Sequence, residues 1–333
     1  MLSHLLFLIF GNGLKGFIKI YTIKLFTKGA LKMNKFYSII RQKLKYGFTV
    51  ELYNFLFMVF PKKIAHPKVA TIDETINRIV DGKCSVSRFG DGEVLLIGKN
   101  PIRFQHSTDL LSQRLAEIIQ SENENHLVCI SDVFDSLKPY NRKARRFWRT
   151  NFYIYGDLWN KYLVKGKIYY NTFMTRPYMD YKNKEAAARW FPMLKQIWND
   201  RDIVFIEGEK SRLGVGNDLF SNARSIRRIL GPAMHAFDKY DELLAKAKEV
   251  ANENTLFLCA LGPTATVISY DLFKAGYQAV DVGHVDIEYE WFRMKVTKKV
   301  KIPSKYTNEA ADGSKVGEST DEIYQSQIIA KII

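Results

Sequence analysis

From about residue 68, short apolar runs alternate with amphipathic stretches. The apolar runs are rich in β-branched residues, which predicts buried strands, and apolar positions three and four apart predict helices. The predicted strands cover residues 84–89, 126–130, 167–173, 202–208, 255–261 and 278–283. The predicted helices cover residues 71–83, 107–120, 183–198, 217–230 and 264–275.

This alternation predicts an α/β fold with a mostly parallel sheet covered by helices on both faces. Ligands of open α/β sheets bind at the carboxyl ends of the strands. Chemistry is therefore expected in the loops that follow the strands. These loops are rich in glycine, acids or hydroxyls, and they cover residues 88–93, 131–135, 209–218, 262–266 and 283–290.

The first of these loops reads "RFGDGE" and places Asp91 and Glu93 on either side of Gly92. Two carboxylates this close offer hard oxygen ligands to Mg²⁺ or Mn²⁺, which keep room for water and diphosphate oxygens. Arg88 would then contact a phosphate or hold the carboxylates in place. Because Asp-Gly is also a common turn dipeptide, a plain turn is the alternative.

The loop "EKSRLGVGND" lies between a predicted strand and a predicted helix. Gly214 and Gly216 would let the backbone approach a ligand, and Asn217 or Asp218 could cap the next helix beside a bound anion. Arg212 could add a charge-assisted contact to a phosphate. A tight turn that needs glycine only for its geometry explains the pattern equally well.

The loop "GPTAT" repeats this arrangement with Gly262, Thr264 and Thr266. Pro263 suits a first helical turn, and the two hydroxyls would lie beside free backbone N–H groups. An ordinary capped turn between a strand and a helix is the alternative.

The last loop, "GHVDIEYE", carries four ionisable groups. If it is extended, His284, Asp286, Glu288 and Glu290 share one face. Crowded carboxylates raise one another's pKa, which suits a general base. A polar edge strand is the alternative.

Composition limits the class of protein. The chain has 333 residues, 47% of them hydrophobic and 14% aromatic, which excludes a disordered composition. Its net charge of +15 favours an anionic partner. The three cysteines, Cys84, Cys129 and Cys259, lie far apart in apolar runs, so we expect buried thiols and no zinc site.

Residues 1–60 carry nine Lys or Arg and a single acid, Glu51. This segment predicts either a basic amphipathic helix on anionic lipid or a helical extension packed on the protein body. The apolar start "MLSHLLFLIF" is too short to span a bilayer and lacks signal-peptide features, and Met33 could be the true start. We expect a cytoplasmic protein, peripheral on the inner face of the membrane if the lipid interpretation holds.

Two other classes of function remain open on these patterns. A Rossmann-type enzyme using NAD or S-adenosylmethionine lacks support, because no complete G-x-G-x-x-G follows the first strand. A nucleic-acid binder rests on the basic, aromatic residues 141–155, which could also form a cleft wall or a solvated helix face.

Four segments in order, "SRFGDGE", "RDIVFIEGEKSRLGVGNDLF", "ALGPTATVISYDL" and "DVGHVDIEYEW", closely resemble the GT-D glycosyltransferases, first catalogued as a bacterial domain of unknown function. The resemblance covers about residues 70–295. It implies a Rossmann-like domain, a nucleotide-sugar donor and a divalent metal, with the family's Asp-x-Glu motif at Asp91 and Glu93. The region of His284 and Glu290 matches the proposed base region. Glu290 is the favoured base, although the two roles could be reversed.

The resulting hypothesis divides the chain into a basic helical extension (1–65), a GT-D-like domain (66–295) and an irregular tail (296–333). The domain would move a sugar, glucose-type as a guess, from a UDP-sugar to a saccharide acceptor in a surface polysaccharide or a glycoprotein glycan. Mn²⁺ or Mg²⁺ would be the cofactor, and no specific nucleic acid is expected as a partner. The expected donor-binding residues are Arg88, Arg212, Gly214, Gly216, Asn217, Asp218, Gly262, Thr264 and Thr266.

Overall fold

The computed structural model describes residues 48–333, and its centre is a nine-stranded sheet in which every strand pair is parallel. The strand order is β1-β4-β3-β2-β8-β7-β5-β6-β9. The strands are β1 (Lys68–Val69), β2 (Ser85–Phe89), β3 (His126–Ile130), β4 (Ile168–Asn171), β5 (Asp202–Gly208), β6 (Ser225–Gly231), β7 (Leu256–Ala260), β8 (Gln278–Asp281) and β9 (Ile328–Lys331). The predicted α/β class and parallel sheet are confirmed.

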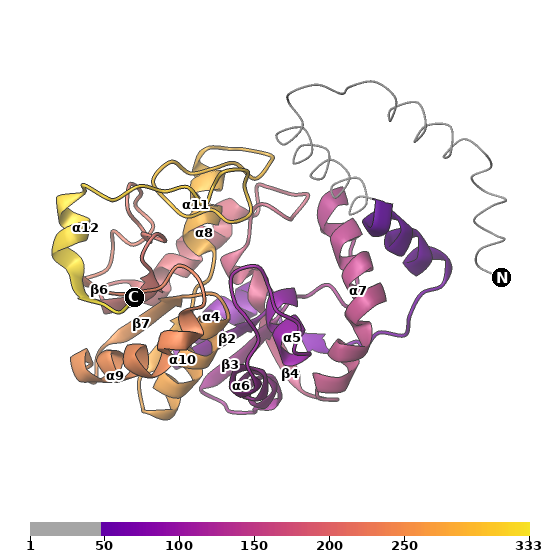
Figure 1. Cartoon of the computed structure of the whole chain (residues 1–333), viewed down its shortest axis with the longest axis horizontal. Coiled ribbons are helices and arrows are strands. Elements are labelled where there is room, and N and C mark those ends of the chain that lie inside the picture. The colour runs from indigo at the N-terminus through magenta and orange to yellow at the C-terminus, as the bar shows by residue number, and fades with distance from the viewer. Residues whose placement is uncertain (1–47) are drawn as a thin grey trace, which may run out of the picture. The chain divides into compact units, whose positions relative to one another are not determined.

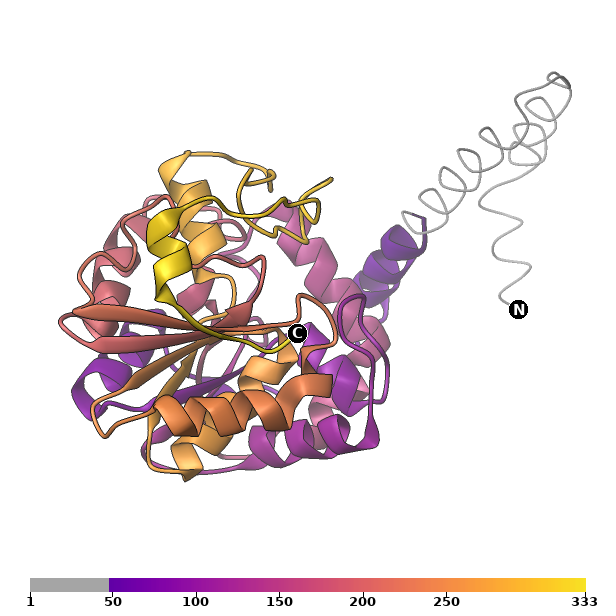
Figure 2. The ribbon, with the colours of Figure 1, turned by 60° about the vertical axis from the view of Figure 1, so that its left-hand side comes forward.

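Helices cover both faces of this sheet. Figures 1 and 2 show α8 and α11 on one face and α6, α9 and α10 on the other. The α-helices are α4 (Ile72–Gly82), α5 (Asp91–Ile97), α6 (Asp109–Gln120), α7 (Arg142–Tyr162), α8 (Ala187–Lys195), α9 (Tyr240–Val250), α10 (Pro263–Lys274), α11 (Val285–Arg293) and α12 (Glu322–Gln327); residues 48–59 are also helical. The predicted capping box of Thr71 and Glu74 is present at the start of α4.

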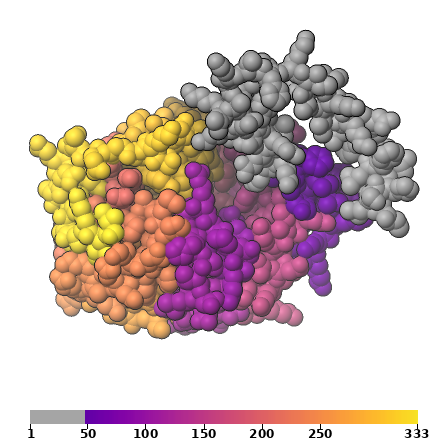
Figure 3. Space-filling model, in the orientation of Figure 1, coloured from indigo at the N-terminus to yellow at the C-terminus, as the bar shows by residue number. Residues whose placement is uncertain are grey.

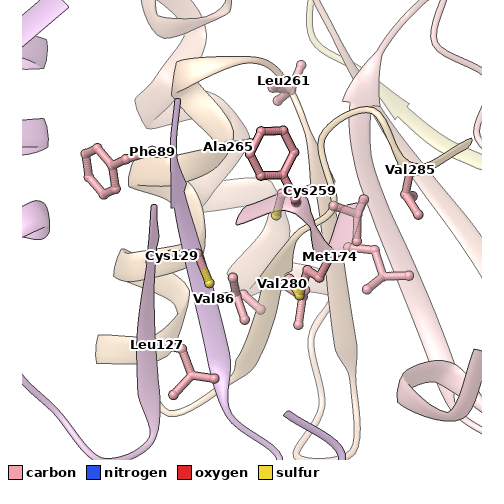
Figure 4. Packing of buried hydrophobic residues seen from close by; sticks show 14 of the residues in the cluster. Val86, Phe89, Leu127, Cys129, Met174, Cys259, Leu261, Ala265, Val280 and Val285 are labelled. Carbon is pink, nitrogen blue, oxygen red and sulfur yellow. The ribbon is translucent and has the colours of Figure 1, made fainter. Parts of the chain in front are cut away.

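The core lies between the central strands and the helices on them. Val86 of β2, Cys129 of β3, Cys259 of β7 and Val280 of β8 are fully buried and lie close together (Figure 4). All three cysteines are buried and unpaired, as predicted. Burial raises the pKa of the Cys84 thiol above its usual range, which keeps this thiol protonated.

The helix predicted over residues 217–230 is wrong, because the chain forms turns there and then enters β6. Ile226, Ile229 and Leu230 fit a helical period, but the same residues pair in register with β5. Arg228 of β6 forms a buried ion pair with Glu207 of β5. Tertiary pairing with the neighbouring strand therefore decided the local structure, as it often does for short β-branched segments.

The segment 283–290 is not extended. His284 is the N-cap residue of α11, and Asp286, Glu288 and Glu290 lie on that helix. A helical period of 3.6 residues places Asp286 and Glu290 on one face and turns Glu288 to another. The proposed single row of four ionisable groups is therefore wrong.

The C-terminal segment, predicted to be irregular, is largely irregular as far as residue 320 but ends in α12 and β9. Strand β9 pairs with β6 and completes one edge of the sheet. Figure 3 shows this segment in yellow on the surface beside the orange elements. Ile302 and Lys305 of this segment are buried, so it packs into the domain and is not a loose tail.

Within residues 48–333, no helix has the length and apolar character required to cross a bilayer. The predictions made for residues 1–47, which concern the basic amphipathic helix and the choice of start codon, lie outside the described residues.

Candidate active site

A cleft with a volume of about 560 Å³ opens at the carboxyl ends of the central strands. The loops after β2, β5, β7 and β8 line it, as the sheet topology predicts. This volume lies within the range of small-molecule sites in proteins. The cleft therefore gathers four of the five loops that the sequence singled out, and Ser131 of the fifth also lines it.

Asp91 and Glu93 enter this cleft from the first turn of α5, directly after β2. Glu93 Oε2 accepts a hydrogen bond of 2.8 Å from the backbone N–H of Gly90, which fixes the start of the helix. Burial raises the pKa of Asp91 and raises that of Glu93 to about 7. Neither carboxylate forms an ion pair with a cation of the described residues 48–333, although the charges of Arg176 and Lys299 act on Asp91 and that of Arg88 acts on Glu93.

Arg88 of β2 lies beside this pair and is held by its own partners. Its Nε donates to Asp281 Oδ1 at 3.2 Å, and its Nη1 donates to Thr175 Oγ1. Gly283 lets the guanidinium pass, because a Cβ at that position would lie 1.9 Å from Arg88 Nη2. Gly283 also has a φ of +45°, which favours glycine. Arg88 is thus fixed in the cleft wall.

A second group of charges faces the cleft and was missed by the sequence analysis. Arg176, after β4, forms an ion pair with Glu309 of the C-terminal segment, and Lys299 contacts the same carboxylate. Although burial raises the pKa of Glu309, the positive charge of Arg176, with smaller contributions from His284 and Lys299, holds it well below its usual value. Asp180 lies 3.7 Å from Lys299 Nζ. No periodic pattern marked these residues in the sequence.

His284 lies in the cleft at the start of α11. Its Nε2 is 3.3 Å from Asn308 Oδ1 and 3.8 Å from Glu309 Oε1. Burial, and then the positive charge of Arg176, lowers the pKa of His284 to about 4. Its imidazole is therefore neutral at pH 7 and can accept a proton or a hydrogen bond.

Glu290 does not line the cleft among the described residues; it belongs to a polar network whose other acid, Asp286, does line the cleft. Lys305, fully buried, places its Nζ 2.7 Å from Asp286 Oδ2 and 3.0 Å from Glu290 Oε1. Asn217 Nδ2 donates to both carboxylates, at 2.8 and 2.7 Å. The N–H of Gly214 donates to Asp286 Oδ1 at 2.9 Å. Gly214 and Asn217, from the loop predicted to bind phosphate, thus form hydrogen bonds that hold α11 in place.

Arg212 is also directed away from the cleft, contrary to its predicted phosphate contact. It is buried and donates to the carbonyl oxygens of Ser304 and Gly317. Asp218 lies on the outer side of the same loop, where it contacts Lys195 and accepts from Tyr289. The side chains of Arg212 and Asp218 therefore serve the packing of the domain, whereas Lys210, Ser211 and Leu213 of the same loop line the cleft.

The two threonines of the "GPTAT" loop are buried at the start of α10. Thr266 Oγ1 donates to the carbonyl of Arg88 at 3.0 Å, which ties α10 to β2. Thr264 Oγ1 has no hydrogen-bond partner in the described structure. Only Gly262 of these three reaches the cleft. Its φ of +55° and the contact that a Cβ would make with Phe104 at 2.8 Å both favour glycine there.

The structure therefore divides the sequence-predicted residues into two sets. In the cleft lie Arg88, Asp91, Glu93, Gly262 and His284. Away from the cleft lie Arg212, Gly214, Gly216, Asn217, Asp218, Thr264, Thr266 and Glu290.

An apolar wall faces the charged residues across the cleft. Phe147 and Trp148 come from α7, Phe104 from the loop before α6, and Met234 from the segment after β6. Phe147 and Met234 are both more than 40% exposed, so they remain accessible to a ligand. The basic, aromatic residues 141–155 thus contribute to a cleft wall, one of the two interpretations left open by the sequence.

The carboxylate pair is the part of the cleft that could bind a divalent metal. The described residues contain no group of three or more His, Cys, Asp or Glu side chains placed to hold an ion. Mg²⁺ is commonly bound by one or two carboxylates together with water and substrate phosphates. Asp91 and Glu93 fit such an open site, because both face the cleft without a cationic partner.

Known proteins resemble this chain in sequence and in structure. The family model of the glycosyltransferase GT-D fold matches residues 86–310. A probable glycosyl transferase, Gly, of Streptococcus gordonii is 40% identical over 265 residues, which cover 79% of this chain and 39% of the relative. The glycosyltransferase GlyD of Streptococcus pneumoniae serotype 4 is 40% identical over 267 residues, which cover 80% of this chain and 33% of the relative.

The chain thus matches well under half the length of these two curated relatives. A solved structure of a glycosyltransferase with domain of unknown function 1792, from Streptococcus sanguinis, superposes with a TM-score of 0.76 at 38% identity. That match covers 80% of this chain and all of the solved chain. The family match extends through the C-terminal residues that face the cleft, as far as 310. This chain belongs to the glycosyltransferases of the GT-D fold.

Proposed function

We propose that the chain transfers a sugar from a UDP-sugar to a saccharide acceptor, and that Asp91 and Glu93 hold a divalent Mn²⁺ or Mg²⁺ for this reaction. The observation that carries the proposal is the pair of cleft carboxylates without a cationic partner. Desolvated, unpaired carboxylates are costly for a fold, and a bound cation offsets that cost. When bound, the metal would neutralise the negative charge of a leaving diphosphate.

The cationic residues of the cleft support an anionic donor. Arg88, Arg176 and Lys299 all face the space in front of the carboxylate pair. Arg88 and Arg176 already pair with Asp281 and Glu309, so their guanidinium groups are held in place before a donor arrives. Guanidinium groups fixed in this way suit the recognition of phosphate oxygens.

We assign the role of proton acceptor to His284 and a positioning role to Glu290. His284 faces the cleft, whereas Glu290 is bound to Lys305 and Asn217. Three charged groups, Arg176, Glu309 and Arg88, influence the His284 imidazole from the segment after β4, the C-terminal segment and β2. A diphosphate that offsets the charge of Arg88 and Arg176 would raise the low pKa of His284 toward the range of an effective general base.

The apolar wall of Phe147, Trp148 and Met234 provides a surface for a sugar ring of the donor or acceptor. Pyranose rings have an apolar face that packs on aromatic side chains, while their hydroxyls bond to polar neighbours. A glucose-type donor and an acceptor in a surface polysaccharide or glycoprotein glycan remain our working assignment.

Thermal unfolding with added ligands tests the donor and metal together. UDP with Mn²⁺ should raise the melting temperature, since a ligand of the native state stabilises it by mass action. NAD and S-adenosylmethionine should not. Asp91→Asn should remove the shift without lowering the melting temperature of the ligand-free protein. A shift with NAD or S-adenosylmethionine and none with UDP would contradict the proposal.

A screen of UDP-sugars for Mn²⁺-dependent hydrolysis then identifies the sugar. UDP-glucose is expected to give the fastest release of UDP, and His284→Ala should slow this release for whichever sugar is preferred.

A further inference from the structure

We propose that α7 and helical residues 53–59, which pack against it, form a docking surface for an anionic lipid bilayer, next to the mouth of the active-site cleft. The surface consists of two parts, which together are called the basic–apolar surface. Its apolar part is Phe55, Met58, Val59 and Phe60, and its basic part is Arg142, Lys143 and Arg149.

Helical residues 53–59 pack on α7 through the face that carries Tyr53 and Phe57. The rings of Tyr53 and Tyr153 are stacked with centroids 5.4 Å apart, and Phe57 lies against Phe152 at 6.2 Å. Figures 1 and 2 both show the two helices side by side. These aromatic contacts account for the face of the helix that lies against α7.

The opposite face of that helix carries large apolar side chains that water reaches. The exposed fractions are 54% for Phe55, 53% for Met58, 49% for Val59 and 65% for Phe60. Single exposed apolar residues are common, but four within six positions form a patch of the kind found at protein or membrane contacts. The packing of the helix on α7 does not account for this patch.

The basic part lies beside this patch. Five Lys or Arg residues fall within positions 142–149, and no acid occurs between Asp135 and Asp157. Arg149 Nη1 lies 3.4 Å from Met58 Sδ, so the basic and apolar parts are in contact. Within residues 48–333, no ion pair joins Arg142, Lys143 or Arg149 to a carboxylate.

Arg142 and Lys143 occupy the first turn of α7, which contains no acid. Cations at a helix N-terminus oppose the helix dipole, so this arrangement is unfavourable without a negatively charged partner. A row of phosphate head groups would supply that charge, and the adjacent apolar side chains would enter the boundary between head groups and acyl chains.

A bilayer fits these observations better than a nucleic acid does. Phe55 and Phe60 offer exposed rings, but Met58 and Val59 between them do not, whereas single-stranded nucleic-acid sites stack successive bases on aromatic side chains. On a membrane, by contrast, any apolar side chain beside a basic cluster can be buried favourably at the boundary between head groups and acyl chains. Lys143 and Phe147 of α7 also line the cleft, so docking would bring the cleft mouth to the lipid surface. The inference stands independently of the proposed donor and metal.

Flotation of the full chain with vesicles tests the proposal. The probe is an equimolar mixture of phosphatidylglycerol and phosphatidylcholine, with pure phosphatidylcholine as the uncharged comparison. The unaltered chain should float with the anionic vesicles, and added salt should release it.

Two paired variants test the two parts of the surface. Arg142→Glu with Lys143→Glu should weaken binding about 25-fold or more, since each basic residue near an anionic surface contributes roughly fivefold. Met58→Ser with Phe60→Ser should weaken it about tenfold. The matched controls are Lys248→Glu with Lys274→Glu, which change the net charge equally, and Ile323→Ser with Ile333→Ser at other exposed apolar positions.

Both controls should bind like the unaltered chain, and equal melting temperatures would show that all four variants fold. The proposal is overturned if the unaltered chain does not bind anionic vesicles, or if the surface variants bind these vesicles as well as the controls do. The second result would assign any binding to residues 1–47. It is also overturned if Met58→Ser with Phe60→Ser dissociates a dimer in light scattering, or if random oligonucleotides compete with the vesicles through the same residues.

Discussion

Two groups of acidic residues lie at the same end of the sheet, and they differ in whether their charge is paired. Asp286 and Glu290 share Lys305 and Asn217 in a network that the protein completes by itself. Asp91 and Glu93 face the cleft without an ion pair, and the cations around them, such as Arg176 and Lys299, act only at longer range. The sequence presents both groups as clustered acids after a strand, so their proximity alone does not separate structural from functional carboxylates.

The difference follows from the cost of burying charge. A buried carboxylate with a well-placed cation and additional hydrogen bonds can be tolerated by the fold. A desolvated carboxylate without an ion pair destabilises the fold. Such carboxylates are therefore found mainly where a ligand or a reaction requires them. We therefore expect changes in the paired group to affect stability first, and changes in the unpaired group to affect activity first.

The largest expected effect on activity comes from the unpaired group. Asp91→Asn should lower sugar transfer about 1000-fold or more, because a bound metal supplies several kcal/mol of charge stabilisation. The free energy of unfolding should stay the same or rise, since the variant removes a carboxylate that burial disfavours. Transfer assays and urea unfolding measure the two quantities. A large loss of stability with full activity would place Asp91 with the structural acids.

The largest expected effect on stability comes from the paired group. Lys305→Met removes the cation between Asp286 and Glu290 and should cost about 3–5 kcal/mol of unfolding free energy. Lys298→Met, at an exposed lysine of the same segment, is the matched control and should change stability by less than about 0.5 kcal/mol. Similar results for both variants in urea unfolding would contradict the central role of the network.

A smaller effect separates the two candidate bases. His284→Ala should lower turnover about 100-fold, the usual size of general-base catalysis, while UDP binding persists. Glu290→Gln keeps the shape of the side chain but weakens its contact with Lys305, so it should cost about 1–2 kcal/mol of stability and change turnover by less than about fivefold.

Steady-state kinetics and urea unfolding of the same two variants provide the test. If Glu290→Gln loses turnover and His284→Ala does not, Glu290 is the base, as the sequence favoured.

The smallest expected effect concerns Glu288, which lies on α11 between the two paired acids but has no cation within bonding distance. Its Oε2 accepts from the N–H groups of Tyr178 and Met179, and burial raises its pKa to about 7. The folded protein therefore holds a proton that the unfolded chain releases near pH 4.5. Folding stability should fall as pH rises from about 4.5 to 7.

The expected size of this effect is about 1–2 kcal/mol, because other titrating groups and local relaxation reduce the contribution of one buried carboxyl. Glu288→Gln should make the stability profile flatter over this range. Urea unfolding at several pH values would contradict the assignment if the variant and the unaltered chain show the same slope.

The sequence predicted much of the fold because its strongest signals are local. The capping box of Thr71 and Glu74 and the apolar runs of β2, β3, β5 and β7 were recognised within a residue or two. The carboxylate pair of the cleft was found because Asp91 and Glu93 are close together in the chain. Helix α9 and strand β9 were not predicted, and the segment of β6 was assigned to a helix, since their period is ambiguous or short.

The candidate site was only partly predictable, because some of its members are far apart in sequence. Arg176 and Glu309 meet in the cleft although 133 positions separate them, and no pattern links them along the chain. Conversely, Arg212 and Asn217 belong to a loop that looks suited to phosphate, yet their side chains bond to Ser304, Asp286 and Glu290.

The sequence by itself determined the α/β class and the carboxylate pair after β2, since short-range spacing and periodicity carry this information. The family was indicated by the resemblance of four segments to the GT-D glycosyltransferases. Tertiary structure decided which charged residues reach the cleft and which of the acids are neutralised by an ion pair, as Asp286 is by Lys305. That choice depends on the direction of each side chain and on partners supplied by the C-terminal segment, such as Lys305 and Glu309. Burial and pairing of charge are properties of the assembled fold, and they distinguish acids that can act from acids that hold the structure together.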